Sequence, residues 1–191
     1  RVQYTRKCID IANLLGAKCV SVTSGKPVSG TYPEKSRIML VDSLQQVVEY
    51  AEKMGVLVCV EYEPGLLIES CDELAELLEQ VNSPFLGANL DVGHSHVLGE
   101  KADSVIEKLG PRIFHVHLED IRGKKHFHRI PGTGDIGFDS IFAALTKAGY
   151  DGYLCVELYT HLNDPVGAAK ASLDYLKPFI DTDCQELQNN Q

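Results

Sequence analysis

The sequence predicts an α/β protein of the (β/α) barrel type, and three observations lead to this prediction. Short apolar runs alternate with segments of helical periodicity, which is the order of βα units around a parallel sheet. The runs are apolar throughout, as is typical of strands buried on both faces. Four of them end in a residue that can bind a metal, and barrels carry their chemistry at the carboxyl ends of their strands. These four runs are 56–61, 86–91, 113–117 and 153–157.

Each expected strand is followed by an expected helix. The strands are 18–23, 56–61, 86–91, 113–117 and 153–157, and the helices are 3–15, 40–54, 70–81, 102–109, 139–149 and 164–176. Glycines mark helix ends at Gly16 and Gly55. Ser70 and Glu73 form a predicted capping box, and Asp139 is a predicted N-cap. A long polar loop, 119–137, separates the fourth strand from the next helix.

The length predicts an incomplete barrel. An eightfold barrel needs about 250 residues, whereas this chain has 191. We expect residues 1–180 to form one partial barrel of about five βα units, with N-terminal units missing, and residues 181–191 to form a frayed polar tail. Open barrel strands would expose unpaired edges. We therefore expect either a partial chain or a homo-oligomer in which another chain completes the sheet.

Charge and composition exclude several kinds of partner. The net charge of −9 and the pI near 5.2 argue against a nucleic-acid partner. No apolar run approaches the roughly 20 residues that span a bilayer, so we expect no membrane partner. The six cysteines include no Cys-x-x-Cys pair. They are expected to be reduced core residues, which favours a cytoplasmic setting.

The strand-ending residues predict a metal site. Glu61, Asp91, His117 and Glu157 each follow an apolar run. Because the carboxyl ends of barrel strands meet at one face, these side chains are expected to converge. Two Glu, one Asp and one His suit a divalent ion such as Mn, Co, Zn or Mg.

Five motifs, taken in order, resemble those of the xylose isomerase-like TIM-barrel family. They are Glu-Tyr-Glu-Pro-Gly at 61–65, Asn-Leu-Asp-Val-Gly-His at 89–94, His-Val-His-Leu-Glu-Asp at 115–120, Pro-Gly-Thr-Gly-Asp-Ile at 131–136, and Gly-Tyr-Asp-Gly at 149–152 leading to Val-Glu at 156–157. The resemblance spans residues 8–178. That family includes sugar (phosphate) isomerases and epimerases, inosose dehydratases, hydroxypyruvate isomerases and endonuclease IV.

The resemblance assigns roles to individual residues. It implies Glu61 rather than Glu63, and His117 rather than His115, as metal ligands beside Asp91 and Glu157. It implies a substrate-binding or supporting role for His94. His128 matches a position that binds substrate in epimerases and metal in endonuclease IV.

The basic run that contains Lys124, Lys125 and Arg129 can recognise an anion or a hydroxyl group, so Arg129 joins His94 and His128 as a predicted substrate-binding residue. The alternative is a solvated loop.

The leading hypothesis is a metal-dependent isomerase or epimerase of a small carbohydrate or sugar phosphate. Glu61 and Glu157 would abstract and return a proton through a metal-bound enediolate. A dehydratase of an inosose-type ketone is the main alternative, with His94 or His128 as the acid. An endonuclease IV-like phosphodiesterase is a further alternative, although His126 stands where those enzymes carry Asp. The last alternative is a non-catalytic partial-barrel module.

Overall fold

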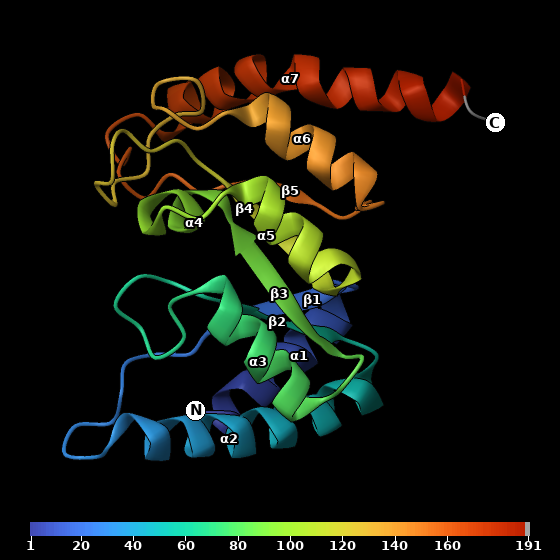
Figure 1. Ribbon diagram of the computed structural model, residues 1–191. Coiled ribbons are helices and arrows are strands. Elements are labelled where there is room, and N and C mark those ends of the chain that lie inside the picture. Colours follow the sequence, from blue (N-terminus) through green and yellow to red (C-terminus); the bar gives the residue numbers. More distant parts are fainter. Residues whose placement is uncertain (190–191) are drawn as a thin grey trace. The chain divides into compact units, whose positions relative to one another are not determined.

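Figure 1 shows the computed structural model, which describes the backbone of residues 1–189 and the side chains of residues 1–180. The predicted tail, 181–191, lies outside the described side chains. The strands are β1 (Cys19–Thr23), β2 (Leu57–Glu61), β3 (Leu86–Asp91), β4 (Ile113–Leu118) and β5 (Leu154–Val156). The helices are α1 (Val2–Leu15), α2 (Pro33–Met54), α3 (Cys71–Val81), α4 (Val92–Leu98), α5 (Ala102–Leu109), a 3-10 turn η1 (Gly110–Arg112), α6 (Phe138–Lys147) and α7 (Pro165–Asn189).

The sheet follows the chain order, β1-β2-β3-β4-β5. The pairings of β1 with β2, β2 with β3, and β4 with β5 are parallel. A helix follows each strand, as a parallel connection requires. The predicted fold class, a TIM (β/α)8-type barrel represented by five βα units, is confirmed for the described residues.

The chain divides into two compact units. Unit 1 comprises Arg1–Leu90 and Arg112–His115, and unit 2 comprises Asp91–Pro111 and Val116–Gln191. Strand β4 contributes its first half to unit 1 and its second half to unit 2.

Unit 1 is an apolar sheet with helices packed on it. Strand β2 is buried from Val58 onward and β3 throughout its length, which explains their unbroken apolar sequence. The predicted glycine stops of α1 and α2 are confirmed, since Gly16 and Gly55 have φ of 71° and 68°. Only glycine adopts this left-handed conformation without a steric cost.

Unit 2 packs α5, α6 and α7 around an apolar core. Phe138 and Phe142 of α6 contact Phe179 of α7, with ring centroids 6.4 Å and 5.2 Å apart. The short helix α4 begins directly after Asp91 and was not predicted. Its seven residues contain Gly93 and β-branched Val92, which give little helical signal.

The structure revises one predicted cap and half of another. Asp139 is not an N-cap: α6 begins at Phe138, and its N-cap residue, Gly137, makes no side-chain cap bond. The first residue of the helix, Phe138, is buried. Ser70 does accept the Glu73 N–H at 3.3 Å. However, the Glu73 carboxylate accepts from the Glu69 N–H rather than closing the capping box.

No helix in the described part of the chain combines the length and apolarity needed to cross a membrane. Five cysteines lie within the described side chains, and none of the five is in a disulfide: Cys8, Cys19, Cys59, Cys71 and Cys155. Cys184 lies outside the described side chains.

Candidate functional site

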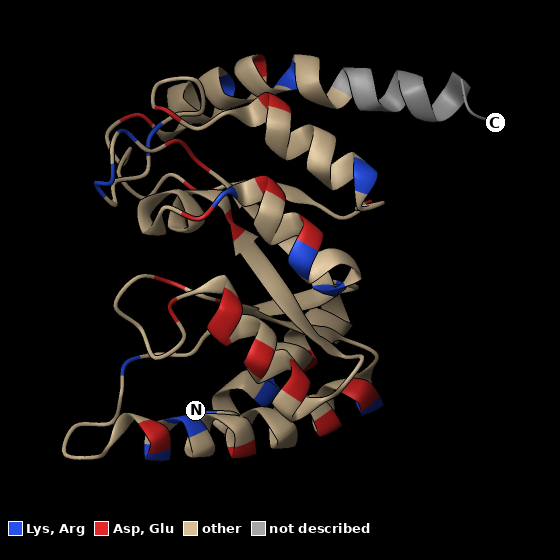
Figure 2. Cartoon of the chain, viewed as in Figure 1, with Lys and Arg blue, Asp and Glu red and all other residues tan. Residues whose placement is uncertain are grey.

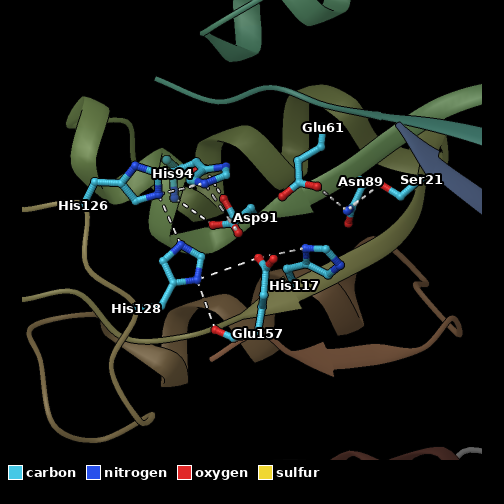
Figure 3. Close-up of polar contacts among 10 residues, drawn as sticks. Ser21, Glu61, Asn89, Asp91, His94, His117, His126, His128 and Glu157 are labelled. Atoms are coloured by element: carbon cyan, nitrogen blue, oxygen red, sulfur yellow. Dashed lines mark hydrogen bonds and ion pairs between the residues drawn. The ribbon is translucent and has the colours of Figure 1, made fainter. Parts of the chain in front are cut away.

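Unit 2 gathers carboxylates and imidazoles from its strand ends and one loop. Asp91 ends β3, His117 lies near the end of β4, and Glu157 follows β5. His94 comes from α4, and His128 comes from the loop between β4 and α6. Figure 3 shows these five side chains turned toward one another. Within unit 2 the structure therefore brings together the predicted metal ligands Asp91, His117 and Glu157 with the predicted substrate-binding residues His94 and His128.

Asp91 links the strand end to α4. Its side chain is fully buried, and Oδ1 accepts the His94 N–H at 2.8 Å, which caps the helix. Asp91 Oδ2 lies 3.8 Å from His94 Nε2. The carboxylate thus fixes the helix that carries His94 and directs its second oxygen to the imidazole.

Glu157 lies between two histidines. Its Oε2 is 3.4 Å from His117 Nδ1 and 3.7 Å from His128 Nδ1. The contact with His117 is the largest cause that lowers the pKa of the Glu157 carboxyl, and the charges of His117, His128 and His94 add to it. Partial burial opposes the shift. Glu157 is therefore held as a carboxylate at neutral pH.

Three histidines form a connected group, which we call the histidine triad: His94, His126 and His128. His126 Nε2 is 3.1 Å from His94 Nε2 and 3.2 Å from His128 Nε2. His128 Nδ1 lies 3.1 Å from the Glu157 carbonyl oxygen, an arrangement in which Nδ1 donates. In the neutral ring this leaves the lone pair on Nε2, directed into the triad.

Glu119 is a site residue that the sequence interpretation missed. Its side chain is fully buried, and neither carboxylate oxygen has a well-aligned donor among the described residues. Burial first, and then the negative charge of Asp91, raise the pKa of Glu119 well above its ordinary value. A Cβ at Gly93 would overlap Glu119 Oε1, so this glycine makes room for the carboxyl group. The period-2 spacing from His117 to Glu119 was the available signal.

The donor atoms of unit 2 fit a divalent cation. Asp91, His117 and Glu157 each offer one ligand atom, and these atoms lie within 4.8 Å of one another. The same holds for Asp91 with Glu119, His128 and Glu157, and for the histidine triad. Mixed carboxylate and imidazole donors suit Mn, Co or Zn. A cation would also offset the charge that the buried Asp91 and Glu119 carboxylates bring together.

Glu61 belongs to unit 1, where a neutral donor holds it. The Asn89 amide donates to Glu61 Oε2 at 3.0 Å and to Ser21 Oγ at 3.0 Å (Figure 3). Glu61 is buried, whereas its rival Glu63 is only half-buried. This anchoring fixes the direction of the Glu61 carboxylate at the carboxyl end of β2.

Arg129 lies elsewhere in the same loop. Its guanidinium donates from Nε to the Thr133 carbonyl at 2.9 Å and lines a small pocket with Arg122, Lys125 and Phe127. Arg129 is thus separate from the histidine triad, although it follows His128 in sequence.

Parallel strands with carboxylates and histidines at their carboxyl ends define a class, the (β/α) barrel-type proteins with a ligand-rich strand-end site. Within that class, the chain belongs to the xylose isomerase-like TIM barrel family, whose model matches residues 1–179.

Several relatives of the chain are named as carbohydrate epimerases or as inosose dehydratases. The chain is 29% identical over 180 residues to a fructoselysine 3-epimerase of Shigella flexneri, covering 92% of this chain and 65% of the relative. It is 28% identical over 162 residues to an inosose dehydratase of Bacillus cereus, covering 76% of this chain and 53% of that protein. The chain thus spans less than two thirds of the length of these curated relatives.

A crystal structure of a D-tagatose 3-epimerase-like protein superimposes with a TM-score of 0.83 at 26% identity, covering 97% of this chain and 70% of that one.

Proposed function

We propose that this protein is a divalent-metal-dependent isomerase or epimerase of a small carbohydrate or sugar phosphate. The single observation that carries the proposal is the convergence of Asp91, His117 and Glu157 within unit 2. The similarity to a fructoselysine 3-epimerase and to a D-tagatose 3-epimerase-like protein supports a carbohydrate substrate.

Asp91, His117 and Glu157, together with Glu61, would hold the ion, which we take to be Mn, Co, Zn or Mg. Glu61 joins this proposal because it ends β2 as a buried carboxylate. When bound, such an ion polarises a substrate carbonyl and acidifies the neighbouring C–H bond.

Two glutamates would move the proton. The lowered pKa of Glu157 keeps its carboxylate ready to accept a proton at neutral pH. Glu61 would exchange the proton on the opposite face of the same carbon. The Asn89 amide keeps the Glu61 carboxylate in a fixed orientation, which a proton transfer in one direction requires.

His94 and His128 would orient the substrate hydroxyl groups. Both imidazoles are buried, and each ring has two nitrogen atoms that can donate or accept a hydrogen bond. Arg129 would act through an anionic or hydroxyl group of a longer substrate, since its guanidinium lies in the pocket beside Arg122.

A dehydratase is the second candidate, and the histidine triad favours it. Three linked imidazoles can supply the proton that a departing hydroxyl group needs. The similarity to an inosose dehydratase points the same way. A phosphodiesterase and a non-catalytic module have no comparable support. A cytoplasmic setting belongs to the proposal because the described cysteines are thiols, and a homo-oligomer stays a prediction.

The test is a screen of the metal-supplemented protein against ketoses, inososes and hydroxypyruvate in deuterated water. Deuterium entering the recovered substrate reports proton exchange at carbon. Wild type should exchange with at least one substrate, and Glu157→Gln should lose most of this activity. Glu107→Gln is the matched control, since Glu107 is an exposed glutamate of α5 in the same unit. Equal exchange in Glu157→Gln and Glu107→Gln would remove Glu157 from the chemistry.

A further inference from the structure

A small pocket in the loop between β4 and α6 collects positive charge. It has a volume of about 130 Å³ and is lined by Arg122, Lys125, Phe127 and Arg129. All four residues belong to unit 2. The chain as a whole carries a net charge of −9, yet Figure 2 shows blue segments gathered in this loop. The pocket is therefore a local reversal of the overall charge.

Two guanidinium groups share one acceptor in this pocket. Arg122 Nη2 donates to the Thr133 carbonyl at 3.1 Å, and Arg129 Nε donates to the same oxygen at 2.9 Å. Because both reach one atom, the two positive charges lie close together. None of the three cations forms an ion pair with a carboxylate among the described side chains. No carboxylate of the described side chains thus lies within ion-pair distance of these cations, and a bound anion would reduce their mutual repulsion.

The loop holds this arrangement without help from a ligand. Asp120 and Arg129 exchange backbone hydrogen bonds of 2.8 Å in both directions. The Asp120 carboxylate accepts the N–H groups of Gly132 and Gly134 at 2.9 Å and 2.7 Å. The other loop acid, Asp135, accepts the Gly123 N–H at 2.7 Å. Both acids are therefore engaged by the backbone, and the Thr133 carbonyl holds the guanidinium groups of Arg122 and Arg129.

The pocket adjoins the histidine triad without being part of it. Lys125, Phe127 and Arg129 line the pocket, whereas the residues between them, His126 and His128, belong to the triad. Alternate side chains of an extended segment point to opposite sides. One short segment thus carries imidazoles on one side and cations on the other.

We propose that this pocket binds an oxyanion of the phosphate class, supplied either as free phosphate or as the phosphate group of a phosphorylated carbohydrate. Planar guanidinium groups match the oxygen atoms of a phosphate, and Lys125 adds a further positive charge. The exposed ring of Phe127, with Lys125 Nζ 5.5 Å from its centroid, forms the apolar wall. The phosphorylated carbohydrate as a source rests on the proposed function, whereas binding of free phosphate does not.

The experiment is a titration of the full chain with inorganic phosphate, with and without added metal. Binding is measured by calorimetry or by the shifts of the amide NMR signals. It is run in about 0.15 M chloride, which screens unspecific attraction. Wild type should show saturable binding in both conditions. Arg129→Gln and Lys125→Gln should each weaken it by about 10- to 100-fold, the effect of losing one charge-assisted contact. Binding without metal keeps this test independent of the isomerase proposal.

Lys124→Gln is the matched control, because Lys124 has the same charge in the same loop but does not line the pocket. Its ammonium lies beside Gly99 instead. Phosphate affinity should stay at the wild-type value in this variant. No saturable binding by wild type, or an equal loss in Lys124→Gln and Lys125→Gln, would overturn the proposal. Lys125 makes no hydrogen bond to the loop backbone in the described structure, so its replacement leaves the fold intact.

A parallel titration with a hexose phosphate and with the same hexose assigns the source. Competition by the hexose phosphate but not by the hexose indicates that the pocket accepts a phosphate group carried by a sugar. Binding of free phosphate without such competition assigns the pocket to a separate anion. Either result supports the oxyanion site.

Discussion

Units 1 and 2 each bury a polar network at their strand ends, but they balance its charge in different ways. In unit 1 a single carboxylate, Glu61, accepts from the neutral Asn89 amide, which also reaches Ser21. In unit 2 three carboxylates, Asp91, Glu119 and Glu157, share a small volume with histidines. A neutral donor satisfies one carboxylate, whereas two adjacent buried carboxylates need a proton or a cation. The difference supports the proposal that unit 2 binds a cation at this site.

The largest expected effect is the loss of metal binding when a donor of unit 2 is removed. Asp91→Ala or His117→Ala removes a donor around which the others converge, so bound Mn, Co or Zn should be lost. Elemental analysis of dialysed protein measures the content. His96→Ala is the control, because His96 contacts the Gly123 carbonyl outside this group. Folded, metal-supplemented wild type that carries no ion would contradict the prediction.

The next effect separates the two glutamates. Glu61→Gln and Glu157→Gln keep the side-chain shape but remove the charge that accepts a proton. Each should lower turnover by roughly 10²-fold or more, the usual scale of general acid–base catalysis. Turnover is compared at saturating metal, so that weaker ion binding does not enter. Near-wild-type turnover in Glu61→Gln would confine the chemistry to unit 2.

A smaller effect is expected from the neutral network of unit 1. Asn89→Ala removes two hydrogen bonds from a fully buried site, one of them to a carboxylate. The free energy of unfolding should fall by about 1.5–3 kcal/mol. Ser21→Ala removes only one of these bonds and should cost less. Urea denaturation measures both, and an undiminished stability of Asn89→Ala would show that the network contributes nothing.

The smallest expected effect is a gain in stability. Burial and the Asp91 charge raise the pKa of Glu119 above its ordinary 4.5. Its contribution to stability is therefore complete below pH 4.5 and is lost as the pH rises through the higher folded-state pKa. Glu119→Gln should stabilise the metal-free protein at neutral pH, because the amide carries no charge to bury, and give no gain near pH 4. Thermal melts at both pH values measure this. A loss of stability at pH 7 would mean that the ionised carboxyl has a partner.

The order of the elements was readable from the sequence, for identifiable reasons. Strands β2 and β3 are buried along most of their length, as their unbroken apolar runs predict. Gly16 and Gly55 end helices because the left-handed conformation needs glycine. Helix α4 escaped prediction because its start depends on the Asp91 cap rather than on its own residues.

The candidate site also has features that the sequence predicts and features that only the structure shows. The ligand types at 61, 91, 117 and 157 follow from the sequence, since each ends an apolar run. The joining of His126 to His94 and the burial of Glu119 against Asp91 depend on contacts between residues far apart in the chain. The hydrophobic periodicity within one segment does not indicate such contacts. The sequence by itself thus determined which groups stand at the strand ends, and the tertiary structure decided which of them lie close enough to interact.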